Sequence, residues 1–596
     1  MNACRPPLAA LGLALLGACA APPAVPQPEA ASGLTAKPGW TFQRQAVAAA
    51  NPLATEAGAQ ILRAGGSAVD AAIAVQMVLT LVEPQSSGIG GGAFLLHHDG
   101  RRLQAFDGRE TAPAAADEKL FLNEQGEPLP FATAVASGRS VGVPGAVMML
   151  ALAHRQHGKL PWARLFDSAV QLAEQGFSIS PRLHTLLAAD AALKTDPVAA
   201  AYFYRADGQP HPVGHVLRNP ELAQALRNIA ANGAAALHEG PLAQAIVNTV
   251  RQHATLPGSL SLDDLKRYQP REREAICFEH TAALRALRVC GFPPPSSGAI
   301  AIGQILGLLA RTPQATAPLS DGLPSVDWLH SYNEASRLAF ADRAQYLADP
   351  DFVAPPAGRW NSLLDTRYLD ERARLITPAR MPQAPAGQPG GVRSSWAPMP
   401  DQPELGTSHI SIVDAFGNAL AMTTTIESAF GSRLMVTTDP KRAGGFLLNN
   451  ELTDFSFKPR DAQGQAIANR VEPGKRPRSS MSPTLVFDKA TGEVLMSAGS
   501  PGGAFIIHYT AKVLHGALQW GLSPQAAVNL PNFGTLGGPL VLEQDRFPAT
   551  TVDALKRRGH TVQQGELTSG AQAIVRGRGM WLGGADPRRE GIVAGD

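Results

Sequence analysis

A glycine–threonine pair at positions 406 and 407 could support nucleophilic chemistry within the chain itself. Thr407 follows a long proline-rich stretch, residues 377–406, and directly precedes a predicted strand, His409–Asp414. Its hydroxyl could attack the carbonyl of Gly406, and an N-to-O acyl shift followed by hydrolysis would leave Thr407 as a new N-terminus. The free α-amine, with a pKa near ~8, could then act as the base for the hydroxyl of the same residue. Taken alone, however, a threonine after a loop is far more often an exposed strand residue.

Other familiar chemistries find little support in the sequence. A glycine-rich turn, Ser86–Gly92, precedes a predicted strand rather than a helix and has no following lysine, so we do not expect it to bind phosphate. Its glycines are expected to allow close backbone packing. No cysteine and histidine spacing is typical of a zinc site, and nothing calls for a metal or an organic cofactor. The net charge of +2 over 596 residues gives no reason to expect nucleic acid as a partner.

Thr407 stands within a series of motifs that follow one another in a characteristic order. In the second half these are residues 407–414, 423–425, 430–431, 447–456, 473–484 and 499–503. In the first half they are residues 65–72, 88–92, 109–110, 141–145, 158–162, 293–298, 337–343 and 349–350. The ordered set resembles the γ-glutamyltransferase (γ-glutamyltranspeptidase) family of the N-terminal nucleophile hydrolases. The resemblance covers nearly everything from about Val47 to Gly591.

This resemblance implies a fold and a catalytic mechanism. The fold is α/β (α+β), a four-layer αββα sandwich, made as one precursor and cut between Gly406 and Thr407 into two subunits. Thr407 matches the nucleophile, and Thr425 matches the threonine whose hydroxyl bonds to the nucleophile and orients it. Gly502 and Gly503 match the backbone N–H pair of the oxyanion hole. Two glycines there would let the main chain approach a tetrahedral oxyanion without a side-chain clash.

The resemblance also implies how a γ-glutamyl group would be recognised. Arg109, Ser479 and Ser480 match positions that hold the α-carboxylate, since an arginine fork binds a carboxylate with two hydrogen bonds and hydroxyls complete its lone pairs. Glu451 and Asp454 match positions that hold the α-ammonium. The implied substrates are glutathione as donor, and water, an amino acid or a peptide as acceptor.

Position 427 departs from the family pattern, because it is glutamate where many members carry asparagine. An ionised carboxylate accepts hydrogen bonds but cannot donate them. Glu427 could strengthen ammonium binding, indicate a different acyl group, or point away from the site. The leading hypothesis is therefore a γ-glutamyltransferase and glutathione hydrolase. Two alternatives stay open: an acylase for glutaryl or cephalosporin amides on the same scaffold, and a lipid-anchored binding protein without catalysis.

Several elements must position these residues. We expect helices at Asn51–Arg63, Ser67–Val82, Leu165–Gly176 and Ser331–Leu347. We expect strands at Ala93–Leu96, His409–Asp414, Ala419–Thr425, Thr484–Asp488 and Val494–Ala498, with a hairpin connection at Asp414–Asn418. Seven prolines between residues 377 and 406 forbid regular structure and predict a long exposed loop.

The N-terminus has the pattern of an export signal. A basic residue precedes a short apolar run, and the run ends in Leu16-Gly17-Ala18-Cys19, which resembles a bacterial lipoprotein signal. The alternative is an ordinary signal peptide cut near Ala20 or Ala21. The expected organisation is a signal peptide at 1–18, a tether rich in alanine and proline at 19–38, a large subunit at 39–406 and a small subunit at 407–596. Lipidation of Cys19 would anchor the protein at the membrane in the periplasm.

Export makes disulfides possible. Cys277 and Cys290 fall in two predicted strands, so they form either a bridge or two neighbouring buried thiols.

Overall fold

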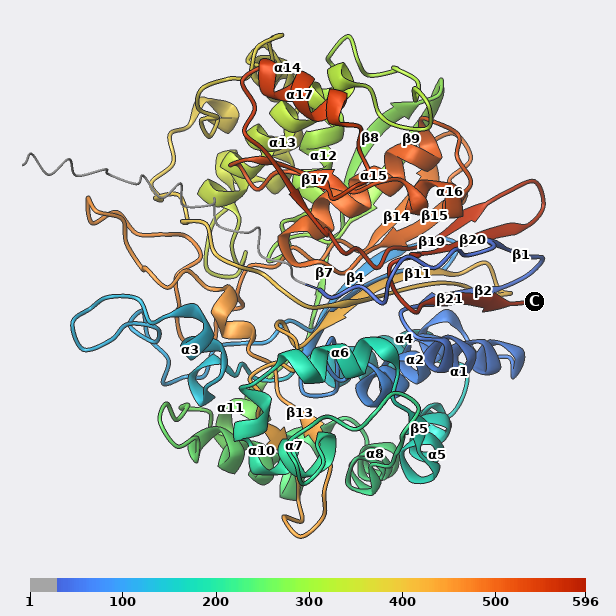
Figure 1. Ribbon diagram of the computed structural model, residues 1–596, viewed down its shortest axis with the longest axis vertical. Helices are drawn as coiled ribbons and strands as arrows, with labels where there is room; N and C mark the ends of the chain where they lie inside the picture. The colour runs from blue at the N-terminus through green and yellow to red at the C-terminus, as the bar shows by residue number, and fades with distance from the viewer. Residues whose placement is uncertain (1–28) are drawn as a thin grey trace, which may run out of the picture.

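The structure of the protein is a computed structural model that describes residues 29–596. Two seven-stranded antiparallel sheets form its centre (Figure 1). The predicted signal peptide, residues 1–18, and Cys19 lie outside the described residues. The first sheet has the order β1 (Trp40–Phe42), β20 (Trp581–Ala585), β19 (Gln572–Arg576), β15 (Val494–Gly499), β14 (Thr484–Asp488), β9 (Arg285–Gly291), β8 (Ile276–Ala282). The second has the order β21 (Ile592–Gly595), β2 (Ala46–Ala49), β10 (Ser408–Val413), β11 (Ala419–Thr425), β3 (Gly92–His98), β4 (Leu103–Asp107), β7 (Arg271–Arg273).

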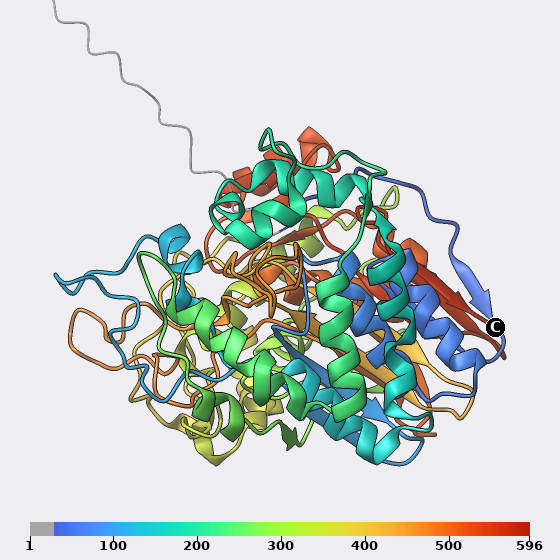
Figure 2. The same cartoon turned by 90° about the horizontal axis from the view of Figure 1, so that it is seen from below.

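Helices cover the outer face of each sheet, as Figures 1 and 2 show from two directions. Beside the second sheet lie α1 (Pro52–Arg63), α2 (Ala68–Val82), α4 (Ala146–His157), α5 (Asp167–Gln175), α8 (Pro220–Asn232) and α10 (Gly240–Arg251). Beside the first lie α12 (Gly298–Leu309), α13 (Val326–Tyr346), α15 (Ile506–Leu518) and α16 (Pro524–Asn529). The shorter helices are α3 (Phe131–Val135), α6 (Pro181–Ala189), α7 (Pro197–Phe203), α9 (Ala235–His238), α11 (Leu262–Arg267), α14 (Thr366–Ala373) and α17 (Ala549–Arg557). Further short strands are β5 (Phe177–Ser178), β6 (Val216–Leu217), β12 (Met435–Val436), β13 (Phe446–Leu447), β16 (Phe533–Gly534), β17 (Leu540–Glu543) and β18 (Val562–Gly565).

Side chains that point alternately to the two faces of each strand separate the outer, helix-covered layers from the layer between the sheets. In β11, Leu420 and Met422 pack with the helices outside the second sheet, whereas Ala419 and Ala421 pack between the two sheets. Phe487 of β14 meets that inner layer from the first sheet. Because both faces of each sheet are covered, these strands are almost continuously buried. The αββα sandwich expected from the sequence is confirmed.

The predicted helices have the capping residues that their boundaries need. Asn51 caps α1 through Leu53 N, and Ser67 and Asp70 form a capping box on α2. Helix α13 begins earlier than expected because Ser325 caps it through Trp328 N. The predicted hairpin turn after β10 is confirmed, and Asp414 Oδ2 accepts Ala68 N at 2.8 Å. This bond fixes the β10–β11 hairpin to the start of α2.

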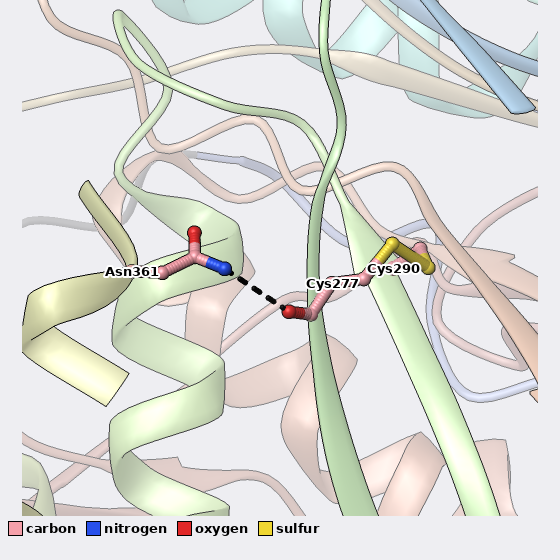
Figure 3. The surroundings of a disulfide bond; sticks show 3 residues. All are labelled: Cys277, Cys290 and Asn361. Carbon is pink, nitrogen blue, oxygen red and sulfur yellow. Dashed lines mark hydrogen bonds between the residues drawn. A yellow bond between two sulfur atoms is a disulfide. The ribbon is translucent and has the colours of Figure 1, made fainter. Parts of the chain in front are cut away.

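Cys277 and Cys290 form a disulfide between β8 and β9 (Figure 3). The two residues face each other in the antiparallel register, with Cα atoms 4.1 Å apart. The bridge, rather than the pair of free thiols, is therefore the correct alternative.

The proline-rich segment is irregular as predicted, apart from a short 3₁₀ turn at Pro389–Gly391, but it is not exposed throughout. Ala397 and Met399 are buried, and their amides bond to Ala466 O and Ala344 O, both at 2.9 Å. The expectation of an exposed loop was wrong here, because scattered apolar residues between the prolines pack against the body. Its last residue before the threonine, Gly406, is also buried.

Residues 29–38, predicted to belong to a tether, lie along the C-terminal part of the chain. Ser32 N donates to Arg588 O at 2.9 Å, and Thr35 N donates to Pro587 O at 2.8 Å. Glu29 is buried. No helix within residues 29–596 is long and apolar enough to cross a membrane.

Candidate active site

Two hydroxyl groups converge on the carbonyl oxygen of Gly406 in the continuous chain. Thr407 Oγ1 donates to it, and so does Thr425 Oγ1 at 2.9 Å. The register of β10 and β11 pairs Ser408 with Thr424, so Thr425 lies across from Thr407 at the end of the hairpin. We had expected Thr425 to bond to the nucleophile's hydroxyl; before cleavage it bonds to this carbonyl instead. The carbonyl of the peptide bond between Gly406 and Thr407 thus accepts two hydroxyl groups.

The glycine-rich turn before β3 allows this arrangement. A Cβ on Gly91 would lie 2.1 Å from Thr425 O, and one on Gly90 would lie 2.2 Å from Leu447 O. Any side chain at these positions would push β11 or its neighbour away. The expectation that these glycines serve close packing is confirmed.

The backbone amide of Thr407 is held by a residue far away in the sequence. Glu29 Oε1 accepts Thr407 N at 2.9 Å. The Glu29 carboxylate is paired with Arg182, and Arg589 Nη1 lies 3.4 Å from Glu29 Oε1 and from Thr407 O. The nitrogen that cleavage would turn into an α-amine therefore lies in a buried cluster of charges.

A nearby histidine is not placed to act as a base. His409 is fully buried, and its ring nitrogens contact Thr423 Oγ1 at 2.9 Å and Ser411 Oγ at 3.0 Å. Burial lowers the pKa of His409 to about 3. A neutral imidazole bonded to two hydroxyls stiffens the hairpin and leaves the role of base to another group.

Of the glycine pair after β15, Gly503 lines the cavity beside Thr407. Gly502 and Gly503 have φ values of +130° and +55°, which L-residues with side chains rarely adopt. A Cβ on Gly503 would lie 1.8 Å from Glu404 O, and Gly503 lines the same cavity as Thr407. A glycine is needed at position 503 because its backbone packs directly against the backbone of Glu404.

Most of the predicted site residues line one cavity beside Thr407. The lining comprises Glu404, Leu405, Thr407, Thr425, Glu427, Glu451, Asp454, Ser479, Ser480, Met481, Gly503 and Ile506. The free space is about 10 Å³, which is at the lower limit for a single water molecule. Glu404 and Leu405 of the proline-rich segment fill the rest, so the uncut chain has no room for a substrate. Within residues 29–596, no group of three or more histidine, cysteine, aspartate or glutamate side chains is placed to hold a metal ion.

In the uncut chain, Arg109 bonds to the main chain directly before Ser479 and Ser480. It is fully buried behind the cavity, where its guanidinium pairs with Glu451 and Asp454 and donates to Pro477 O at 3.0 Å and to a second carbonyl. The residue predicted to bind the carboxylate is therefore ion-paired with the two predicted to bind the ammonium. The physical reason is that a buried guanidinium requires compensation by charge and hydrogen bonds, and these carboxylates supply it.

Two oxygens of that ion-paired group have no partner among residues 29–596. Glu451 Oε2 and Asp454 Oδ1 are buried and accept no hydrogen bond from this part of the chain. Burial raises the pKa of Glu451 and of Asp454 well above the usual range of a carboxyl group, although Arg109 opposes the shift. Unpaired buried acceptors of this kind are costly unless a donor is supplied from outside.

Ser479 and Ser480 have different partners. Ser479 Oγ accepts Met481 N at 3.2 Å and so shapes its own loop. Ser480 Oγ donates to the carboxylate of Glu404 and accepts Arg343 Nη2 at 2.7 Å. Only Ser480 contacts a carboxylate.

Glu427 points into the cavity, which excludes the possibility that it faces away. Its carboxylate accepts Leu405 N at 3.0 Å, Ser428 Oγ at 2.7 Å and Asn450 Nδ2. Burial raises the pKa of Glu427. The backbone of Glu427 has φ +74°, a conformation that a residue with a long side chain keeps only when its surroundings enforce it.

Four residues of the site were not singled out from the sequence: Glu29, Glu404, Arg343 and Arg478. Arg343 and Arg478 fall within motifs that carry the family resemblance, so their positions were visible but their role was not. Long-range packing brings Glu29 to Thr407 and gives Glu404 its partners Arg343 and Ser480, so neither residue carries a local signal.

Comparison with known proteins places the chain in a family. Residues 54–596 match the model of the gamma-glutamyltranspeptidase family. The glutathione hydrolase proenzyme of Bacillus subtilis (strain 168) is 34% identical over 561 residues, covering 92% of this chain and 91% of that protein. The glutathione hydrolase proenzyme of Escherichia coli (strain K12) is 33% identical over 597 residues, covering 97% of each.

A solved structure shares the fold over nearly the whole chain. The cephalosporin acylase from Bacillus halodurans superposes with a TM-score of 0.79 at 27% identity, covering 94% of this chain and 97% of that one. Together with the family match and the residues around Thr407, these similarities show that the chain belongs to the γ-glutamyltranspeptidase family of enzymes.

Proposed function

We propose that the chain is a proenzyme that cuts itself between Gly406 and Thr407. Thr407 Oγ1 attacks the carbonyl carbon of Gly406, the C–N bond breaks as the nitrogen takes the hydroxyl proton, and an ester forms. Water then hydrolyses the ester, which frees the carboxylate of Gly406 and the amine and hydroxyl of Thr407. The observation that carries this proposal is the convergence of the Thr407 and Thr425 hydroxyls on the Gly406 carbonyl. A donor on that oxygen stabilises the negative charge that develops there.

The cut enzyme would be a γ-glutamyltransferase and glutathione hydrolase. Thr407 Oγ1 would attack the γ-glutamyl amide, its own α-amine would accept the proton, and the backbone N–H groups of Gly502 and Gly503 would stabilise the oxyanion. The amine portion of the donor would leave with that proton. Water, an amino acid or a peptide would then take the acyl group from the ester. The relatives named glutathione hydrolase proenzyme support glutathione as the first donor to test.

An acylase acting on glutaryl or cephalosporin amides is the second candidate. The similarity to a cephalosporin acylase over nearly the whole chain favours this candidate. The pairing of Glu451 and Asp454 with Arg109 also favours it, because it offsets part of the negative charge that would attract an ammonium group. Glu427 and the two unpaired oxygens favour an ammonium-bearing acyl group instead. The non-catalytic binding protein is set aside, because the family consists of enzymes and the hydroxyls needed for cleavage lie together.

The first experiment compares purified wild type with Thr407→Ala by denaturing gel and intact mass. The wild type should give two pieces that meet at Gly406 and Thr407, and the variant should stay whole. Equal cutting of both proteins, or a folded wild type that stays whole, would contradict self-cleavage by Thr407.

The second experiment compares two chromogenic donors on the cut wild type. γ-Glutamyl anilide carries a carboxylate and an ammonium on the same carbon, whereas glutaryl anilide has the carboxylate alone. A γ-glutamyltransferase should prefer the first by about tenfold or more, since one charge-assisted hydrogen bond is worth about 1.5–3 kcal/mol. Equal rates on both donors would favour the acylase.

We further propose export with a signal peptide at residues 1–18 and lipidation of Cys19, so that the mature protein is anchored in the periplasm. The sequence pattern before Cys19 supports this. Wild type should fractionate with membranes, and Cys19→Ala should move to the soluble periplasmic fraction. Membrane association that survives Cys19→Ala would contradict the anchor.

A further inference from the structure

A second cavity, separate from the one beside Thr407, lies among the helices that cover the second sheet. It has about 1000 Å³ of free space, against about 10 Å³ beside Thr407. Its walls come from α10, from β12 and from residues around the start of α7, and Figure 1 shows α7 and α10 near the β12–β13 hairpin. Within residues 29–596, the two cavities share no lining residue. We call this second cavity, which borders Gln244, Asn248 and Gln252, the α10 pocket.

Three exposed side-chain amides line the α10 pocket at intervals of four residues. Gln244 and Asn248 lie on α10, and Gln252 directly follows it. Residues four positions apart fall on one side of a helix, and each such step rises about 6 Å along its axis. Gln244 Nε2 donates to Asn248 Oδ1 at 2.9 Å, whereas Asn248 Nδ2 and the side-chain amide of Gln252 bond no group within residues 29–596. The row therefore offers donors and acceptors at a regular spacing.

The α10 pocket offers no free charge to a ligand. Of its lining side chains within residues 29–596, Asp196 and Arg433 are the carboxylate and the guanidinium, and both are engaged. Asp196 Oδ1 caps α7 by accepting Ala199 N at 2.8 Å, and Arg433 Nη2 pairs with Asp190 Oδ2 at 3.0 Å. Burial lowers the pKa of His253, so its ring is neutral. Phosphates and nucleic acids require cationic partners, so the lining favours an uncharged ligand.

An extended peptide main chain matches this lining. Residues that point the same way along a strand repeat every ~6.6 Å, close to the step between the amides of α10. A side-chain amide donates and accepts at once, so each one can pair with the N–H and C=O groups of a peptide. Val198, Leu434 and Met435 add apolar surface for its side chains. No phenylalanine, tyrosine or tryptophan within residues 29–596 lines the pocket, so a sugar ring would find no aromatic face to stack on.

We propose that the α10 pocket is a second binding site, which takes a free peptide without charged side chains in an extended conformation. Gln244, Asn248 and Gln252 pair with the main chain of that peptide. The segment from Glu427 to Arg433 borders both cavities, so the bound peptide lies beside the backbone that carries Glu427 into the catalytic cavity. Binding requires no cleavage, because none of these contacts involves the proline-rich segment.

The test titrates an acetylated and amidated hexapeptide of alternating serine and alanine into the protein, with Kd read from saturation-transfer NMR. Wild type and uncut Thr407→Ala should both bind it saturably and with the same Kd. Asn248→Leu keeps nearly the same side-chain shape without the amide, and it should raise Kd roughly tenfold, since two hydrogen bonds to the peptide are lost. Gln252→Met removes the next amide of the row and should also raise Kd.

Two controls separate main-chain recognition from other effects. Asn232→Leu removes an exposed amide at the end of α8, outside the pocket, and should leave Kd unchanged. The same hexapeptide with N-methylated main-chain amides has lost its N–H donors, and it should bind wild type at least tenfold more weakly.

The absence of saturable binding to wild type and Thr407→Ala would overturn the proposal. An unchanged Kd in Asn248→Leu and Gln252→Met would do the same, and so would equal binding of the N-methylated peptide. Binding to cut wild type but not to Thr407→Ala would place the peptide in the catalytic cavity instead. Maltohexaose that binds wild type and is lost in Asn248→Leu would assign the pocket to a carbohydrate, which also overturns the proposal.

Discussion

At the scale of single residues, the carbonyl of Gly406 is the point on which the chemistry depends. Thr425 donates to it at 2.9 Å and also accepts Glu427 N at 2.7 Å, so its hydroxyl is held in one orientation. A donor fixed in this way costs no reorganisation when charge develops on the oxygen.

Thr425→Ala should therefore slow self-cleavage without removing the nucleophile. Loss of one oxyanion donor typically reduces a rate by about 100-fold or more. The measurement is the fraction of cut chain with time after refolding or synthesis, read on a denaturing gel. Thr425→Ser keeps the hydroxyl and should cut much faster than the alanine variant; equal rates for the two would contradict this role.

The carboxyl groups of Glu451 and Asp454 predict a pH dependence of donor binding. Burial raises the pKa of both, so they take up protons at a higher pH than ordinary carboxyl groups. Only the ionised form attracts an ammonium, so the attraction is present above the raised pKa and is lost as pH falls through it. KM for γ-glutamyl anilide should rise on acidification from neutral pH, whereas KM for glutaryl anilide should rise less. Parallel pH profiles for the two donors would contradict the assignment of these residues to the ammonium.

At the scale of elements, Glu29 reaches Thr407 from 378 positions earlier in the sequence. Its carboxylate accepts the amide of Thr407, and it is held there by Arg182. After cleavage the same nitrogen would be an α-amine. A carboxylate within hydrogen-bond distance favours the charged form of an amine and so raises its pKa.

Glu29→Gln should therefore shift the acidic limb of the kcat/KM profile of the cut enzyme toward lower pH. The amine, freed of a neighbouring negative charge, would lose its proton more readily and act as a base at lower pH. The check is a kcat/KM profile with glutaryl anilide, whose binding does not depend on an ammonium. Asp117→Asn, which removes an exposed carboxylate on a distant surface turn, serves as the control. A shift toward higher pH in Glu29→Gln would contradict the contact.

At the scale of the whole molecule, both sheets are built from the two sides of the proposed cut. In the second sheet, β10 and β11 from residues 407–596 lie between β2 and β3 from residues 39–406. In the first, β14 pairs with β9 across the same division. Each piece alone would expose sheet edges and a large apolar surface.

The two pieces should consequently remain one particle after cleavage. Cut wild type is expected to elute in native size exclusion at the volume of uncut Thr407→Ala, and to separate only in denaturant. Elution of two smaller species under native conditions would contradict the interleaved sheets.

Local patterns in the sequence were enough to predict the main elements and to propose the reacting residues. Capping residues such as Ser67 and Asp70, the glycines before β3 and the hairpin residues after β10 are local signals, so the helices and strands could be predicted from them. The ordered motifs identified Thr407, Thr425 and the glycine pair, and the structure brings Thr407, Thr425 and Gly503 to one cavity.

The pairing of the buried charges became visible only in the folded chain. The pairing of Arg109 with Glu451 and Asp454 could not be seen in the motifs, because they give the residues of a site without their partners, and a buried guanidinium pairs with whichever carboxylates the fold leaves nearest. Glu29 and Glu404 could not be found at all, since the first lies 378 positions from Thr407 and the second belongs to a segment without regular structure. Packing between distant parts of the chain, which no local pattern encodes, brings Glu29 to Thr407 and supplies Arg343 and Ser480 as partners of Glu404.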